Sequence, residues 1–178
     1  MNVTVIADST VDGLTPVTAQ LVGVASSIGG VATVLCPGGI GASEAASISG
    51  VSRVISVEGD CFGTFEGGAW ATALDSQATG DLVLAAASSR GRDIAASLAA
   101  IRNIPVIQDA TGLQGGMVVT RPIYSGKAME TSNVSTPCVV TLRANAFDGA
   151  PDGGSAEIST VNQSADVGLA VKEAIAKA

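Results

Sequence analysis

Two serines and two arginines stand where a predicted strand passes into a predicted helix. Ser88 and Ser89 can cap that helix, and Arg90 and Arg92 lie in its first turn. The start of a helix carries partial positive charge and free N–H groups, so it attracts anions and disfavours arginines. A phosphate, a carboxylate of a partner chain, or Asp93 would make the arginines favourable. The stretch predicts an anion contact; arginines that extend into solvent or pair with an internal carboxylate are the alternative.

A second stretch, TRPIYSGKA, brings an arginine close in sequence to the single tyrosine of the chain. Pro122 fixes the backbone after Arg121, and a glycine turn follows Tyr124. Tyr124 can stack on a ring or donate its hydroxyl. An ordinary hairpin with an exposed tyrosine at its tip is the alternative. The candidate cofactor-binding residues of the two stretches are Ser88, Ser89, Arg90, Arg92, Arg121, Tyr124, Ser125 and Gly126.

The side chains that most enzymes use for catalysis are scarce. The chain has no histidine, so the commonest general base is missing and no Ser-His-Asp or Cys-His arrangement can form. Cys36, Cys61 and Cys138 form no Cys-x-x-Cys pair, so buried, reduced thiols are expected rather than a zinc site. Neither a P-loop nor a dinucleotide-binding glycine motif follows the first strand. These features favour a binding protein over an enzyme.

Acidic side chains at predicted strand ends give a weaker signal. Asp8, Asp12, Glu58 and Asp60 have the oxygen ligands that magnesium prefers. Carboxylates are common in surface loops, however, so no metal site is predicted.

The composition indicates one domain over residues 1–178. Only 14% of the residues are charged, against the usual quarter, so a partner covers part of the surface or small residues form it. The net charge of −7 argues against a nucleic-acid partner. No apolar run is long enough to span a membrane, and the first residues lack the basic segment of a signal peptide. We expect a cytoplasmic protein that does not insert into membranes.

Apolar, β-branched segments alternate with helix-like segments in the first two thirds of the chain. This alternation predicts a three-layer α/β sandwich with a mostly parallel, doubly wound, Rossmann-like sheet and right-handed crossovers. The expected strands span residues 2–7, 31–39, 52–59, 81–88 and 104–113, and the expected helices span 15–30, 41–48, 65–80 and 88–103.

The pattern changes after residue 113. Two short strands are predicted over 117–124 and 127–134, and a strongly apolar strand over 136–144. We expect these segments to form an antiparallel addition at the sheet edge near the C-terminus. A loop over 148–156 and a last helix over 164–178 complete the prediction.

The sequence resembles the N-terminal domain of the electron transfer flavoprotein alpha subunit. The residues that carry the resemblance are LVLAAASSRGRDIAASLAA, VIQDATGL and RPIYSGKAMETSNVSTPCVVTLRANAF, at 82–100, 106–113 and 121–147. The last of these is the most specific, because it combines an Arg-Pro-x-Tyr-x-Gly hairpin with a strand that leads to Arg-x-x-Ala-Phe.

The resemblance implies an adenine nucleotide alpha hydrolase-like sandwich, a heterodimer with a beta-type subunit, and a role in electron transfer. The family holds FAD mainly in a C-terminal domain, whose Gly-Arg-Gly motif is not found near residue 160, and Lys127 replaces the usual asparagine. We therefore expect a docking subunit that lacks the full FAD domain, with FAD bound weakly or shared with a partner or a separate flavin domain. For Arg90 and Arg92 the resemblance favours a protein carboxylate or an internal acid over a phosphate.

Two other hypotheses remain open. The chain could be a free-standing module that binds AMP, ATP or FAD at the strand ends. It could also be an enzyme such as a nucleotide hydrolase, although the missing histidine and P-loop make an electron carrier or a binding module the favoured class.

Overall fold

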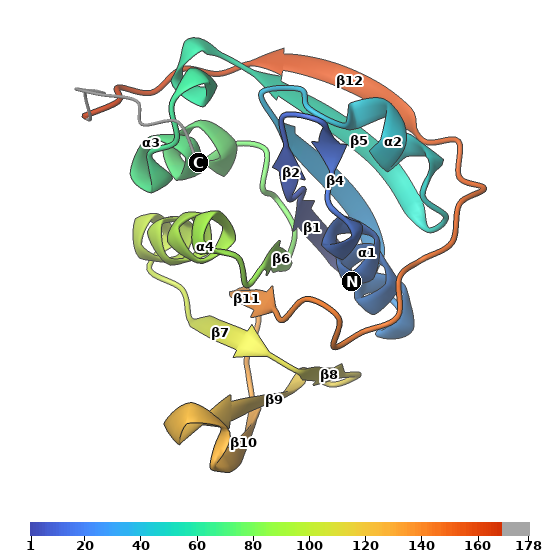
Figure 1. Cartoon of the computed structure of the whole chain (residues 1–178), viewed down its shortest axis with the longest axis vertical. Coiled ribbons are helices and arrows are strands. Elements are labelled where there is room, and N and C mark those ends of the chain that lie inside the picture. Colours follow the sequence, from blue (N-terminus) through green and yellow to red (C-terminus); the bar gives the residue numbers. More distant parts are fainter. Residues whose placement is uncertain (169–178) are drawn as a thin grey trace, which may run out of the picture.

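A seven-stranded parallel sheet forms the centre of the computed structural model, which describes residues 1–168 (Figure 1). The strand order across the sheet is β12-β5-β4-β1-β6-β11-β7, and every neighbouring pair is parallel. The strands are β1 (Asn2–Ile6), β4 (Val31–Pro37), β5 (Val51–Glu58), β6 (Leu82–Ala86), β7 (Val106–Ala110), β11 (Cys138–Leu142) and β12 (Glu157–Asn162).

Helices cover both faces of this sheet, as the doubly wound prediction requires. Helices α1 (Pro16–Ser27) and α2 (Ala42–Ser47) lie on one side, and α3 (Gly67–Asp75) and α4 (Ser89–Arg102) lie on the other (Figure 1). Strand β1 contacts both layers: Val5 packs in the cluster of α1 and α2, and Ile6 packs in the cluster of α3 and α4. Because both faces are buried, inner strands such as β6 and β11 are nearly continuous apolar runs.

The helix starts follow local chemistry. Pro16 occupies the first turn of α1, where a missing N–H costs nothing. The helix predicted over 65–80 forms over Gly67–Asp75 despite its two glycines. The Glu66 side chain caps it, because its carboxylate accepts from the backbone N–H groups of Gly68 and Ala69.

The strand predicted over 136–144 does not belong to the antiparallel addition. It forms β11, which lies between β6 and β7 inside the parallel sheet. All five residues of β11 are buried. The physical reason is visible in the residues Cys-Val-Val-Thr-Leu: an interior parallel strand is covered on both faces, whereas an edge strand would alternate apolar and polar side chains.

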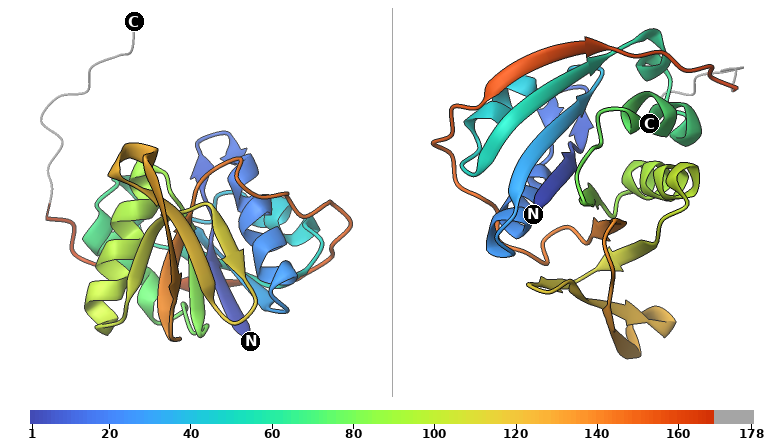
Figure 2. Two further views of the ribbon diagram at one scale, coloured as in Figure 1. Left: turned by 90° about the horizontal axis from the view of Figure 1, so that it is seen from below. Right: turned by 180° about the vertical axis from the view of Figure 1, so that it is seen from behind.

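The antiparallel addition is a separate three-stranded sheet. It consists of β8 (Gly112–Gln114), β9 (Val118–Ile123) and β10 (Ala128–Asn133), in the order β10-β9-β8. Strand β9 packs against β7 at the edge of the central sheet, and the small sheet extends beyond that edge (Figures 1 and 2). The expected addition is therefore confirmed, built by the two predicted short strands and β8. A two-stranded hairpin of β2 (Ser9–Thr10) and β3 (Gly13–Leu14) follows β1.

The chain after β11 returns along α1 to the opposite edge of the sheet. The predicted loop contacts this helix, since the Ala150 N–H donates to the Ala19 carbonyl. Strand β12 then pairs with β5. No strand was expected there, because the segment Glu157–Asn162 has exposed or half-buried side chains and lacks a continuous apolar run. The helix predicted over 164–178 lies mostly outside the described residues, and residues 164–168 form no helix.

Candidate functional site

The carboxyl ends of β1 and β6 form the position where open α/β sheets bind ligands. These two strands are neighbours, and the chain leaves them toward opposite faces, into α1 and α4. Such a reversal of direction opens a crevice. A hollow of about 360 Å³ lies there, lined by Asp8, Ser9, Thr10, Val11, Thr15, Ser88, Ser89 and Arg90.

An internal carboxylate already lies in this crevice. The Ser88 hydroxyl donates to Oδ1 of Asp8 at 2.8 Å and accepts from the Gly91 N–H at 3.1 Å. Thr15 stands at the N-cap position of α1, but its hydroxyl donates to Oδ2 of Asp8 at 2.7 Å and makes no capping hydrogen bond to the helix. Asp8 thus places a negative charge beside the start of α4, where the helix dipole favours one.

The first turn of α4 packs directly on the end of β6. A Cβ atom at Gly91 would lie 2.1 Å from the carbonyl oxygen of Ala86, so only glycine fits there. The predicted cap at Ser88 is confirmed. Ser89 is exposed and lines the hollow without capping the helix.

Arg90 lies against aromatic rings. Its guanidinium is 5.4 Å from the ring centre of Phe65 and 6.0 Å from that of Trp70. Phe62 and Phe65 both meet Trp70 edge to face, and the Trp70 indole N–H donates to the carbonyls of Cys61 and Thr64. A cation over a ring face is attracted by the ring quadrupole. The aromatic cluster therefore offsets the unfavourable position of Arg90 at a helix start.

Arg92 has a different partner. Its Nη2 lies 3.4 Å from Oδ1 of Asp109, at the end of β7. Arg143, just after β11, donates to both oxygens of the same carboxylate, with Nε 3.0 Å from Oδ1. The alternative of pairing with an internal carboxylate therefore holds for Arg92, and the carboxylate belongs to Asp109 and not to Asp93. The hydrogen bonds from Arg143 hold the pKa of Asp109 below its usual value.

Asp109 is also held by its backbone. Its φ of +66° is in the left-handed region, which aspartate tolerates better than most residues. Its N–H donates to the Thr141 hydroxyl at 2.8 Å, and that hydroxyl donates to Gln108. Asp109 and Arg143 could not be paired from the sequence, because the adjacency of β7 and β11 has no local signal.

The second predicted stretch forms the turn between β9 and β10. Arg121 pairs with Glu130 across the two strands, with Nε 2.6 Å from Oε2. The Tyr124 side chain is 77% exposed. Tyr124 and Ser125 both have left-handed backbones, with φ of 51° and 57°, which is strain of the kind found at functional turns.

The two predicted stretches lie at the same end of the molecule but form no common pocket. The turn between β9 and β10 lies at the end where α4 begins (Figure 2). Within residues 1–168, no hydrogen bond or ion pair joins residues 88–92 to residues 121–126. The candidate residues are thus divided between the crevice and an exposed turn.

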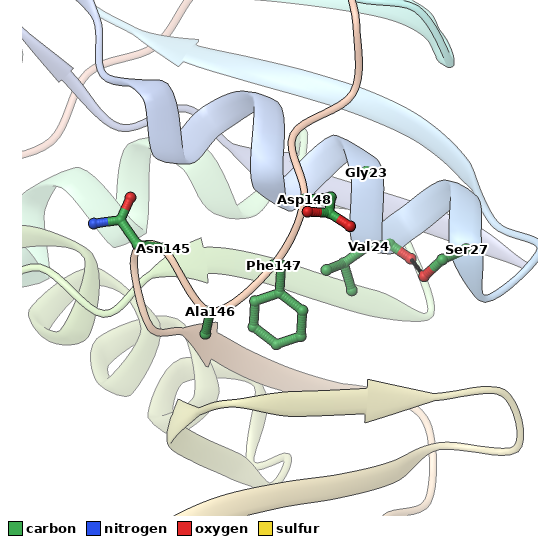
Figure 3. A pocket seen from close by; sticks show the side chains of 7 residues that line it. All are labelled: Gly23, Val24, Ser27, Asn145, Ala146, Phe147 and Asp148. Atoms are coloured by element: carbon green, nitrogen blue, oxygen red, sulfur yellow. Dashed lines mark hydrogen bonds between the residues drawn. The ribbon is translucent and has the colours of Figure 1, made fainter.

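Another hollow, of about 380 Å³, lies between α1 and the segment after β11 (Figure 3). Gly23, Val24 and Ser27 line it on the helix side. Residues 145–148 line it on the other, and Phe147 also packs against the core. Among the described residues that line it, only Asp148 is charged, so these residues offer no cation to a phosphate.

Other kinds of site find little support in the described part of the chain. It contains no cluster of three or more potential metal-ligating side chains, and none of its helices has the length and apolarity to cross a membrane. All three cysteines are buried and free, as expected. Burial raises the pKa of the Cys36 thiol to about 12 and that of Cys138 to about 11.

Comparison with known proteins gives one consistent result. The model of the electron transfer flavoprotein domain matches residues 3–166. The electron transfer flavoprotein subunit alpha of Paracoccus denitrificans is 31% identical over 158 residues, which cover 85% of this chain and 51% of that protein. The subunit alpha of Pseudomonas aeruginosa is 30% identical over an alignment of 193 positions, which covers 99% of this chain and 60% of that protein.

The chain spans between half and three fifths of the length of these two relatives. The match runs through both predicted stretches and includes Asp109 in β7 and Arg143 just after β11. The chain belongs to the electron transfer flavoprotein family.

Proposed function

We propose that the chain acts as an alpha-type subunit of an electron transfer flavoprotein in the cytoplasm and docks to a beta-type subunit. The observation that carries this proposal is the family match over residues 3–166, together with relatives that are named as alpha subunits. In this proposal the chain contributes to electron transfer by docking to the beta-type subunit and forming a heterodimer with it.

The described residues do not fit a complete FAD. The crevice volume of about 360 Å³ is near the lower end of the range for pockets of drug-sized ligands, about 300–1,000 Å³, and FAD is larger. The Asp8 carboxylate would repel the diphosphate, and Arg90 is already held against Phe65 and Trp70. We propose that FAD is bound weakly by this part of the chain, or is shared with the partner subunit or a separate flavin domain.

The exposed turn between β9 and β10 supports a docking role. Tyr124 and Met129 are two of the large apolar side chains that the described surface exposes. Tyrosine and methionine are enriched in protein interfaces. The outward residues near them, Pro122, Thr131 and Thr120, carry no charge, as is usual at the centre of an interface.

The test is reconstitution with a defined partner. The purified chain is mixed with the beta subunit of the Paracoccus denitrificans electron transfer flavoprotein and FAD, and the mixture is analysed by size-exclusion chromatography with flavin absorbance. A one-to-one complex supports the proposal, and flavin in that peak supports a shared site. Failure of the two chains to associate overturns it.

A second candidate function rests on the crevice alone. Its volume accommodates a ligand smaller than FAD, such as AMP, at the position that open α/β sheets use. Denaturing the natively purified protein and assaying the supernatant tests this hypothesis. Stoichiometric AMP or ATP would favour the nucleotide-binding module, and an empty supernatant would favour the docking subunit.

A further inference from the structure

The charges of the chain are divided between two halves of the fold. Residues 82–147 contain six arginines and lysines against three acidic residues, a net charge of +3. Residues 1–81 and 148–168 contain one basic residue, Arg53, against twelve acidic residues, a net charge of −11. We call the first set the basic half and the second set the acidic half.

These sets are separate regions in space as well as in sequence. The sheet order places β12, β5, β4 and β1 together, and all four belong to the acidic half. Strands β6, β11 and β7 follow, with the small sheet beyond them, and all belong to the basic half (Figure 1). The boundary therefore runs between β1 and β6.

The basic half also holds positive charge that internal acids leave uncompensated. Arg92 and Arg143 share the single carboxylate of Asp109, so one guanidinium charge of this group remains. The side chains of both arginines are 48% exposed. Lys127 is exposed in the turn beside Tyr124, and its ammonium has no partner among the described residues.

These cations lie at one end of the molecule together with an exposed tyrosine. Arg92 and Arg143 lie at the carboxyl ends of the strands, and the turn with Tyr124 and Lys127 lies at that same end of the molecule (Figure 2). An interface with an exposed tyrosine and flanking arginines is typical of protein recognition. The acidic half, with its net charge of −11, would repel an acidic partner.

We infer that Arg92, Lys127 and Arg143 form the face that meets the beta-type partner, and that the partner's contact surface is acidic. The inference rests on the proposed function and adds the orientation and the chemistry of the contact. Complementary charge steers the encounter and fixes the orientation of docking, and salt screens it.

Charge-reversal variants test the inference against a matched control. Lys127→Glu is the decisive variant. The Lys127 side chain makes no hydrogen bond or ion pair with a described residue, so its replacement should not disturb the fold. Arg143→Glu tests the contribution of the two arginines that share Asp109. Arg53→Glu is the control, since it makes the same charge change at an exposed position of the acidic half. The Arg53 side chain donates a hydrogen bond to the Ser159 hydroxyl at 3.5 Å and forms no ion pair with a described residue. Circular dichroism at increasing temperature checks that each variant is folded.

The measurement is the Kd for the Paracoccus denitrificans beta subunit at 20 and 300 mM salt. We expect wild-type affinity to fall about tenfold with salt, and each basic-half variant to bind about five- to tenfold more weakly at low salt. The Arg53→Glu variant should stay within about twofold of wild type.

The outcomes separate the two proposals. If wild type binds but salt has no effect, or Arg53→Glu weakens binding as much as Lys127→Glu, the inferred face is wrong and the docking function stands. If wild type does not bind at all, the proposed function fails and this inference fails with it.

Discussion

Asp109 and Arg143 form a two-point ion pair that joins the ends of β7 and β11, although 34 positions separate them in the sequence. The Arg143 Nε and Nη2 groups donate to the two carboxylate oxygens, and Arg92 approaches the same carboxylate from α4. The pair therefore links a helix and two strands at the carboxyl end of the sheet. It also explains why an arginine is tolerated in the first turn of α4.

Replacing Asp109 should change the pH dependence of stability. Because the native pKa of Asp109 is lowered, the unfolded chain takes up a proton before the native state does as the pH falls. The stabilisation is full above the unfolded pKa of about 4 and is lost as the pH falls through the native pKa. Asp109→Asn should therefore flatten the fall in the free energy of unfolding below about pH 4. Urea denaturation between pH 2.5 and 7 measures this, and an unchanged slope would contradict it.

Comparing Asp109→Ala with Asp109→Asn measures how much the left-handed backbone at residue 109 contributes to stability, because both variants remove the charge. Asparagine tolerates the left-handed conformation at this position, whereas alanine does so at a cost of about 1 kcal/mol. At pH 7 we expect Asp109→Ala to be less stable than Asp109→Asn by about that amount, measured by urea denaturation. Equal stabilities would show that the backbone conformation at residue 109 does not matter.

Removing the Ser88 hydroxyl should destabilise the start of α4. The hydroxyl caps the helix by accepting from the Gly91 N–H, and it donates to the Asp8 carboxylate. Loss of a serine cap costs about 1 kcal/mol. Urea denaturation of Ser88→Ala should show a loss of at least that size. Ser89→Ala is the matched control: its side chain is exposed, and we expect a change within about 0.5 kcal/mol. Similar losses in both variants would argue against a specific cap.

Arg90→Ala should change the emission of the single tryptophan. Trp70 is buried, and Arg90 covers part of the ring cluster that contains it. Loss of the cation–π contact should lower the free energy of unfolding by about 0.5–1 kcal/mol and shift the fluorescence maximum. Arg92→Ala, whose partner is Asp109, should leave the emission unchanged. An identical spectrum for wild type and Arg90→Ala would show that Arg90 does not rest on these rings in solution.

The cysteines should be unreactive in the folded protein. All three are buried, and burial raises the thiol pKa of Cys36 to about 12 and that of Cys138 to about 11. At pH 8 almost no thiolate of these two groups is present to attack a disulfide reagent. We expect negligible reaction with Ellman's reagent in the native state and three thiols after denaturation in guanidinium. A fast-reacting thiol in the native state would contradict this arrangement.

The order and type of most elements could be predicted because their signals are local. Buried parallel strands are short continuous apolar runs, such as Leu82–Ala86, and helices show apolar side chains three or four positions apart. Pro16 and Ser88 mark helix starts through their own backbone chemistry. These signals were enough for the doubly wound class and for the candidate residues at the start of α4.

Strand neighbours could not be predicted, because pairing in a parallel sheet joins backbone groups that carry no residue-specific code. The residues of β11 indicate burial on both faces, but only the tertiary structure places that strand between β6 and β7. The residues of β12 are exposed or half-buried and do not form the continuous apolar run of a buried strand. An edge strand needs only backbone hydrogen bonds from its one neighbour, so its side chains are free to be polar.

The candidate site divides in the same way. The sequence by itself determined that two arginines stand at a helix start and that a tyrosine occupies a glycine turn, since both depend on residues adjacent in the chain. Only the tertiary structure decided that Arg90 meets aromatic rings, that Arg92 shares Asp109 with Arg143, and that Asp8 occupies the crevice. The physical reason is that a charge selects its partner by distance in space, which depends on how the strands are ordered in the sheet.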